Sequence, residues 1–237
     1  GDDSLLRAGL RAGMGLPYEC STGSCGTCKF QLLDGETEEL WPDAPGLSER
    51  DKRKDRRLAC QNRPLSDCKI KMRLDPAAIP QILPRRQMVR VVDIRELAHD
   101  MHVFRFSGET AADFLPGQYA LLSLPGVTGL RAYSMANLAN ESGEWHFHIK
   151  NMLGGSGSHA LFDGVVAPGQ EVELDGPYGL AFLRESGRDI VCVAGGSGLS
   201  PMVSIARGVA ADVRFRERRL YFFFGGREPR DICGEEF

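Results

Sequence analysis

The chain has 237 residues, of which 42% are hydrophobic and 26% charged, and its formal net charge at pH 7 is -3. This balance excludes a disordered or fibrous protein and gives no electrostatic reason to expect nucleic acid as a partner. No apolar stretch approaches the roughly 20 residues that a membrane span needs. Seven cysteines without a visible secretory signal favour a reducing compartment, and we expect the cytoplasm.

The first third of the chain predicts a small α+β domain with a cysteine-rich loop. Leucines near helical spacing indicate a helix within residues 3–14. Strands are expected at 29–33 and 68–73, with a short charged helix at 47–57 between them. The basic residues of that helix alternate with acidic ones, so we interpret it as a solvated face rather than a docking surface for an acidic partner. Prolines recur between residues 76 and 84, which indicates a linker and a domain boundary.

The middle of the chain reads as strands separated by turn signals, which is typical of a small antiparallel barrel. The expected strands are 87–94, 101–107, 118–124, 131–135, 144–151 and 171–175. The last segment differs, because an apolar strand at 190–194, a glycine turn, a helix at 201–209 and a strand at 219–224 follow in order. That order predicts the start of a parallel α/β sheet.

Four cysteines have the spacing of a plant-type [2Fe-2S] ferredoxin. Cys20, Cys25 and Cys28 form a C-x4-C-x2-C loop. Cys60 follows alone, far downstream. Two irons need four thiolates, and glycines in the loop let the backbone bend around the inorganic sulfide. A zinc site is the alternative, but zinc ribbons usually pair two short C-x2-C knuckles, and here the fourth ligand has no partner knuckle.

The other cysteines and two histidines have ordinary structural interpretations. Cys68 opens a strand and Cys192 lies within one, so both are expected as small core residues. Cys233 has no assigned role. His146 and His148 share a face of one strand, and we interpret them as barrel residues rather than metal ligands, because no third ligand is near in sequence.

Two motifs in the middle of the chain indicate a flavin site. Residues 131–134 read Arg-Ala-Tyr-Ser, in which the arginine can pair with a pyrophosphate, the tyrosine can lie on an isoalloxazine ring and the serine can reach flavin N5. An isolated four-residue match of this kind would be interpreted as an exposed strand with a charged first residue. A glycine turn at 154–157 then enters a helix at 159–162, with Ser158 as the expected N-cap, and a helix N-terminus suits phosphate.

A third motif indicates a nicotinamide nucleotide site. The apolar strand at 190–194 enters Gly195-Gly196-Ser197-Gly198, after which Ser200 and Pro201 are expected as the N-cap and first residue of a helix. This is not the G-x-G-x-x-G fingerprint, because proline stands where the last glycine would be. The run 175–179, Asp-Gly-Pro-Tyr-Gly, is expected to close the barrel and to face the glycine turn. Arg227 and Glu235 follow the next strand, at the edge where open α/β sheets bind ligands.

In this order the motifs resemble the reductase components of bacterial multicomponent oxygenases, in which a ferredoxin precedes a ferredoxin-NADP-reductase-like module. The runs 40–47, 58–61 and 64–67 look most like the toluene and phenol monooxygenase reductases. The resemblance implies a β-grasp ferredoxin domain at 1–75, a linker at 76–86, an antiparallel FAD-binding barrel at 87–185 and a parallel α/β NAD(P)-binding lobe at 186–237. Counterparts of the first ferredoxin strands and of half the nucleotide lobe are missing, so we interpret the chain as a fragment.

The resemblance assigns residues to each cofactor. The cluster ligands are Cys20, Cys25, Cys28 and Cys60. The flavin contacts are Arg131, Tyr133, Ser134, Gly155 and Ser158. The nucleotide loop is formed by Gly195, Gly196, Gly198 and Pro201. No acid–base residue is assigned; Tyr133 and Ser134 supply the environment of the flavin.

The function implied is electron transfer from NADH through FAD and the [2Fe-2S] cluster to an oxygenase component, by a monomeric protein. NADH rather than NADPH rests on the resemblance. The expected partner is a diiron aromatic monooxygenase, and the reductase of a Rieske aromatic-ring dioxygenase is the alternative within the class. A zinc-binding interaction module is the alternative of another class.

Overall fold

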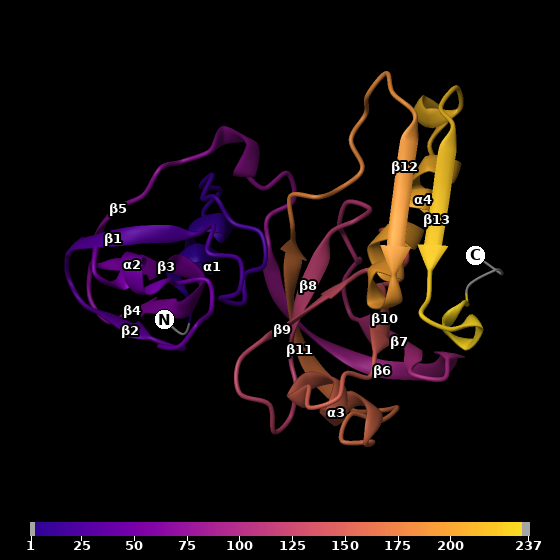
Figure 1. Ribbon diagram of the computed structural model, residues 1–237, viewed down its shortest axis with the longest axis horizontal. Helices are drawn as coiled ribbons and strands as arrows, with labels where there is room; N and C mark the ends of the chain where they lie inside the picture. Colours follow the sequence, from indigo (N-terminus) through magenta and orange to yellow (C-terminus); the bar gives the residue numbers. More distant parts are fainter. Residues whose placement is uncertain (1–2, 234–237) are drawn as a thin grey trace. The chain divides into compact units, whose positions relative to one another are not determined.

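The computed structural model describes residues 3–233, and the chain divides into two compact units, Gly1–Arg85 and Arg86–Phe237 (Figure 1). The first unit combines short strands with short helices, and the second unit is built around longer strands. In the described part of the chain, no helix combines the length and apolar character required to cross a membrane.

The first unit combines a helix with two small antiparallel sheets. Helix α1 (Leu5–Arg11) begins where the Ser4 hydroxyl accepts a hydrogen bond from the Arg7 backbone N–H, and it buries Leu6 and Leu10 completely. One sheet has the order β3–β1–β5 and the other pairs β2 with β4. Their bounds are β1 (Lys29–Asp34), β2 (Thr37–Glu39), β3 (Arg56–Leu58), β4 (Asn62–Pro64) and β5 (Lys69–Lys71).

The charged helix expected at 47–57 is wrong in extent. Helix α2 spans only Glu49–Lys52, begun by a capping box between Ser48 and Asp51. Asp55 then takes a left-handed backbone conformation with φ 50°, which ends the helical path. The following residues, Arg56–Leu58, pair with β1 instead, because this places Leu58 in the core. The pairing of this segment with β1 therefore outweighs the helical tendency of its local charge pattern.

The charges of this segment are partly neutralised within the first unit. Lys29 Nζ lies 2.8 Å and Arg56 Nη1 3.1 Å from the carboxylate of Asp51. Hydrogen bonds from Lys29 and Ser48 hold the pKa of Asp51 well below its usual range. The segment thus forms its own ion-pair network at the surface.

A six-stranded sheet dominates the second unit, in the order β10–β7–β6–β11–β8–β9. Its strands are β6 (Arg85–Ala98), β7 (Met101–Gly108), β8 (Tyr119–Ser123), β9 (Arg131–Ser134), β10 (Glu144–Lys150) and β11 (Glu171–Tyr178). The ladders of β10 with β7, β7 with β6, β11 with β8, and β8 with β9 are antiparallel, as expected. The ladder does not close into a complete barrel, since the described edge strands β9 and β10 are linked through a single bridge between Met135 and Phe147.

Aromatic and branched side chains fill the inside of this curved sheet. Phe104, Phe106 and Phe147 are fully buried, and the rings of Phe106 and Phe147 meet edge to face at 5.7 Å. Helix α3 (Ser156–Phe162) packs Leu161 into the same core. The core thereby fixes the positions of β9 and α3, the two elements that carry the expected flavin residues.

The last part of the second unit is a parallel β–α–β unit (Figure 1). Strand β12 (Ile190–Gly195) pairs with β13 (Leu220–Gly225), and α4 (Leu199–Ala211) connects them. The parallel sheet expected from the sequence is confirmed. The expected start of the helix is wrong, because Gly196–Gly198 forms a 3-10 turn that runs directly into α4 with Gly198 as N-cap. Ser200 and Pro201 are therefore the second and third helical residues.

Neighbouring valines on β6 test the assignment of the core. Val91 is 1% exposed and Val92 47% exposed. Truncation of Val91 removes two buried methyl groups and leaves a cavity, so Val91→Ala should lower the free energy of unfolding by about 2 kcal/mol. Val92→Ala should change it by less than about 0.5 kcal/mol. Denaturant unfolding of both variants checks this, and equal losses would contradict the burial pattern.

Candidate functional site

The four cysteines expected to bind the cluster come from one loop and one distant segment. The loop 20–28 precedes β1, and the carbonyl of Cys28 accepts a 2.9 Å hydrogen bond from the N–H of Ala59. This bond brings the neighbouring Cys60 beside the loop. Cys28 and Cys60 are buried, whereas Cys25 is exposed and Cys20 lies between these extremes.

Backbone N–H groups point at the sulfur of Cys20. Those of Thr22, Ser24 and Cys25 donate to Cys20 Sγ at 3.4, 3.3 and 3.3 Å. Partial burial opposes ionisation, but the hydrogen bonds from Thr22 and Cys25 outweigh it and lower the pKa of Cys20 to about 7. The thiolate is the form that binds metal, so the loop is arranged for a charged sulfur before any metal arrives.

The two buried thiols interact directly. A hydrogen bond between Cys28 and Cys60 lowers the pKa of Cys28 and raises that of Cys60. Four sulfurs, with N–H donors directed at the exposed side of the set, fit the chemistry of an iron–sulfur cluster. The alternative of unrelated core cysteines does not explain the N–H groups aimed at Cys20.

Glycines let the loop pack against a second turn. The N–H of Gly46 donates to the carbonyl of Gly23 at 2.9 Å. Gly26 has φ 75°, and a Cβ there would lie 2.4 Å from the carbonyl oxygen of Gly46. Any side chain at Gly26 would therefore push the two turns apart.

The remaining cysteines differ in burial. Cys192 is 1% exposed, as expected of a core residue, and burial raises its pKa. The expectation for Cys68 is wrong, since it is only partly buried and its thiol lies 3.3 Å from the carbonyls of Glu36 and Ser66. Cys233 packs at the edge of a small cluster that includes Phe224.

The two motifs expected to bind flavin lie side by side. Arg131 Nη2 donates a 2.8 Å hydrogen bond to Ser156 Oγ at the start of α3, and Nη1 donates to the carbonyl of Thr128 at 3.0 Å. A Cβ on Gly157 would lie 2.9 Å from both Arg131 Cγ and Tyr133 Oη. Strand β9 and the glycine turn therefore form one surface, although they are distant in sequence.

Tyr133 is held as a neutral phenol in this surface. Burial raises its pKa to about 12, against the opposing effect of the Arg131 charge. Its ring meets that of Phe147 edge to face at 6.4 Å. Contact with Phe147, in the core of the sheet, thus fixes one side of the Tyr133 ring.

Ser158 does not cap α3, contrary to the sequence expectation. Gly155 occupies the N-cap position and Ser158 lies in the first turn. The Ser158 hydroxyl accepts from the N–H of Met152 at 3.1 Å and donates to the carbonyl of Gly155 at 3.0 Å. The Ser158 hydroxyl therefore shapes the glycine turn, and α3 begins without a side-chain cap.

The glycine turn after β12 is open. A Cβ on Gly198 would meet nothing within 4 Å, and one on Gly195 would touch only the carbonyl of Gly225 at 3.6 Å. Packing within the described chain does not require glycine at these positions, so close approach of a ligand is the remaining physical reason for it. Pro201 follows in the first turn of α4.

The other motifs that the sequence singled out have structural partners. The Tyr178 hydroxyl donates to Asp175 at 2.8 Å, and both side chains are fully buried. Arg227 follows β13 and its N–H donates to the carboxylate of Asp231 at 2.8 Å. Glu235 lies outside the described residues.

The histidines of β10 are embedded in the protein. Burial, followed by the charges of Arg207 and His146, lowers the pKa of His148 to about 4. His146 Nε2 lies 3.0 Å from the carboxylate of Glu144 and burial lowers its pKa too. Within residues 3–233, neither histidine belongs to a set of three side chains placed to hold a metal.

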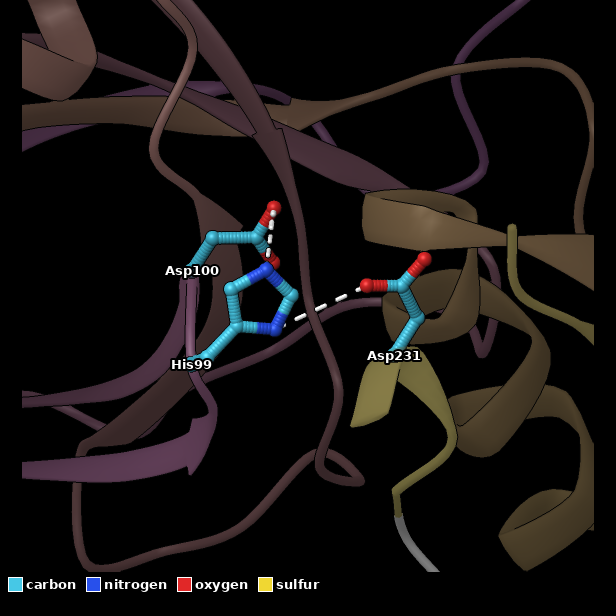
Figure 2. Close-up of side chains that lie close together, drawn as sticks. All are labelled: His99, Asp100 and Asp231. Atoms are coloured by element: carbon cyan, nitrogen blue, oxygen red, sulfur yellow. Dashed lines mark ion pairs between the residues drawn. The ribbon is translucent and has the colours of Figure 1, made fainter. Parts of the chain in front are cut away.

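One charged cluster was not singled out by the sequence. Figure 2 shows His99 between Asp100 and Asp231, at 3.7 and 3.6 Å. Lys150 Nζ lies 2.8 Å from the same Asp100 oxygen, and Asp231 also accepts two backbone N–H bonds. The cluster joins the β6–β7 turn to the segment after β13 through these polar contacts. Sequence spacing gives no signal for it.

Comparison with protein families matches three segments of the chain. Residues 1–65 match the 2Fe-2S iron-sulfur cluster binding domain, residues 88–182 the oxidoreductase FAD-binding domain and residues 192–237 the oxidoreductase NAD-binding domain. The cysteine loop, the surface around Arg131 and the open turn after β12 each fall within one of these segments.

Relatives cover nearly the whole chain. The ferredoxin--NAD(P)(+) reductase CarAd of Metapseudomonas resinovorans is 45% identical over 233 residues, 96% of this chain and 69% of the relative. The ferredoxin--NAD(+) reductase component of the alkene monooxygenase system of Xanthobacter autotrophicus is 48% identical over 223 residues, 93% and 67% of the two chains. A solved structure, the ferredoxin reductase in carbazole 1,9a-dioxygenase, superposes with a TM-score of 0.91 at 40% identity, covering 99% of this chain and 69% of its own.

Gly26 gives a direct test of the cysteine loop, with Gly13 as its control. Both glycines have φ near +75° in the first unit, but a Cβ on Gly13 meets nothing within 4 Å. Gly26→Ala should abolish incorporation of iron and sulfide, because the new methyl group displaces the Gly46 carbonyl. Gly13→Ala should carry only the backbone strain of about 1 kcal/mol and keep the cluster. Iron and sulfide analysis of both purified variants decides, and equal cluster content would contradict the packing argument.

Buried His148 predicts a pH dependence of stability. Its folded pKa of about 4 lies below the usual 6.5 of the unfolded chain, so the unfolded state binds the extra proton and stability falls as pH decreases from 7 to 4. The loss attributable to His148 is about 3 kcal/mol. His148→Gln should flatten this slope of the unfolding free energy between pH 7 and pH 4. An unaltered slope in His148→Gln would contradict the assigned burial of a neutral imidazole.

Proposed function

The chain belongs to the family of oxidoreductases that join a [2Fe-2S] ferredoxin domain to FAD- and NAD-binding domains, the reductase components of oxygenase systems, and from this premise we propose how its residues serve electron transfer from NADH to an oxygenase. When bound, the nicotinamide supplies a hydride, the flavin accepts two electrons and releases them singly, and the cluster carries one electron at a time. The protein's own residues would bind the cofactors, orient them and exclude water.

The cluster is held by Cys20, Cys25, Cys28 and Cys60 in this proposal. Three N–H groups directed at Cys20 Sγ support it, because such bonds stabilise thiolate charge and tune the potential of an iron–sulfur centre. The lowered pKa of Cys20 provides a charged ligand near neutral pH.

The flavin is held by β9 and the turn before α3. The observation that carries this assignment is the bond from Arg131 Nη2 to Ser156 Oγ, which gathers both motifs into one surface. Arg131 would pair with the pyrophosphate of FAD, and the glycine turn at Gly155, shaped by Ser158, would admit its oxygens. Tyr133 and Ser134 would line the isoalloxazine ring, and Tyr133 stays uncharged there up to about pH 11 because of its raised pKa.

The nicotinamide nucleotide is held at the turn after β12. Gly195, Gly196 and Gly198 would let phosphate oxygens approach the backbone, which is most open at Gly198, and Pro201 follows in α4. Hydride transfer needs no general acid or base from the protein, which agrees with the neutral Tyr133 and the neutral His148 in this unit.

The electron acceptor is an oxygenase component, and we favour a monooxygenase. The resemblance of the runs 40–47 and 58–61 to toluene and phenol monooxygenase reductases supports this choice, and so does the 48% identity to an alkene monooxygenase component. The similarity to a reductase found with carbazole 1,9a-dioxygenase keeps a Rieske dioxygenase as the second candidate. Reconstitution with each oxygenase type separates the two.

We also propose that the protein is a monomer and that it is located in the cytoplasm.

Anaerobic stopped-flow spectroscopy of the full-length protein tests the route. On mixing with NADH, flavin absorbance should fall before cluster absorbance, because only the flavin can accept a hydride. Cys60→Ser should keep the first phase and lose the second, while Cys68→Ser, with its partly buried thiol far from the ligand loop in sequence, should keep both. Cluster reduction ahead of the flavin, or NADH oxidation without flavin reduction, would overturn the route.

A further inference from the structure

A polar stripe runs along one face of α4, at the join between the nucleotide segment and the sheet. Ser200, Ser204 and Arg207 have the spacing i, i+4, i+7 and therefore project from the same side of the helix. Ser200 is 1% exposed and Ser204 is fully buried. Buried hydroxyls need hydrogen-bond partners, and here those partners lie outside the helix, so they show what the helix holds.

The partners are backbone carbonyls at the end of β9 and in the residues that follow it. Ser200 Oγ donates to the carbonyl of Ser134 at 2.6 Å, and Ser204 Oγ to that of Asn137 at 2.8 Å. Arg207 Nη1 donates to the carbonyl of Ala136 at 2.9 Å. All three carbonyls belong to residues 134–137, so α4 holds the segment that leaves β9 through three side-chain donors.

Ser200 makes a second bond that Ser204 lacks among the described contacts. Its Oγ accepts from the backbone N–H of His148 in β10 at 3.2 Å while donating to Ser134. One hydroxyl thus ties together three segments: the end of β9, the middle of β10 and the first turn of α4. With both its donor and its acceptor capacity used, the rotamer of Ser200 is fixed.

The position of this hydroxyl links the two halves of the proposed reaction site. Ser200 lies two residues beyond Gly198, the last glycine of the open nucleotide turn, and its acceptor is the carbonyl of Ser134, the expected flavin neighbour. Resting on the proposed function, we infer that Ser200 is a positioning residue for hydride transfer, which sets the nucleotide turn against the flavin strand.

The demands of the reaction explain why such a tie is needed. Donor and acceptor atoms must approach to roughly 3–3.5 Å, and a displacement of about 1 Å can lower the rate on the order of a hundredfold. The flavin strand and the nucleotide turn are far apart in sequence, so only a cross-contact can set their separation. Ser204 anchors the same helix one turn further on, at about 6 Å along the axis from Ser200, and does not reach Ser134.

Ser204→Ala is therefore the matched control for Ser200→Ala. Each change removes one buried hydroxyl from the same helix and the bond it donates to a backbone carbonyl, and Ser200→Ala also removes the bond accepted from His148. Neither residue is assigned to contact a cofactor. A difference between the two variants in flavin chemistry then reports on position and not on general loosening of the helix.

The first readout uses flavin-free protein and needs no activity. Ser200→Ala should accelerate hydrogen exchange of the His148 amide relative to wild type, because the Ser200 hydroxyl that accepts from that N–H is removed. Ser204→Ala should leave this amide unchanged. Unchanged exchange in Ser200→Ala would overturn the assigned contact.

The second readout is single-turnover flavin reduction by NADH in the protein with both cofactors. Ser200→Ala should lower the limiting rate at saturating NADH about tenfold, with the dissociation constant for NADH altered less than about threefold, and Ser204→Ala should keep the wild-type rate. Equal rates in both variants and wild type would overturn the inference, as would a loss confined to NADH affinity. If NADH fails to reduce wild-type flavin that dithionite does reduce, the proposed function itself is wrong, and the amide exchange still judges the contact.

Discussion

The hydrogen bond between Arg131 and Ser156 is the interaction on which the flavin half of the account depends. It joins the end of an antiparallel strand to the start of a short helix, and Gly157 lets the two approach because no Cβ intervenes between Arg131 and Tyr133. The sheet core beneath, through Phe147 and Leu161, makes this approach rigid. A pyrophosphate site built on a fixed guanidinium and a glycine turn needs little rearrangement on binding, which favours affinity.

Both cofactor loops of the chain solve the same physical problem in different ways. The cysteine loop must bring a backbone close to sulfur charge, and it does so with N–H groups aimed at Cys20 and a turn that only Gly26 permits. In the turn after β12, Gly196 has a left-handed φ of 54°, whereas a Cβ on Gly198 would meet nothing within 4 Å. The protein's own packing requires glycine at position 26, but it does not require glycine at position 198, where the backbone is left open.

Much of this organisation could be predicted from the sequence, because it depends on local spacing. The C-x4-C-x2-C loop, the alternating strands of the sheet and the strand–turn–helix order after residue 190 all have short-range signatures. The predictions that were wrong concern residues whose partners are distant. Ser158 and Ser200 have the chemistry of helix caps, but the hydroxyl of Ser158 is used by its own loop and that of Ser200 by β9 and β10. The charged segment after Ser48 turns into a strand because β1 offers a partner.

The stripe on α4 and the cluster around His99 could not have been found from spacing alone, since each depends on contacts between remote segments. The central claim remains that one chain carries an iron–sulfur cluster and a flavin. Chemical analysis of anaerobically purified, reconstituted full-length protein tests it most directly, by measuring iron, acid-labile sulfide, zinc and FAD in one sample. The account predicts iron and sulfide in equal amounts, with one FAD for each pair of irons. Zinc without sulfide, or colourless protein that retains no FAD, would contradict it.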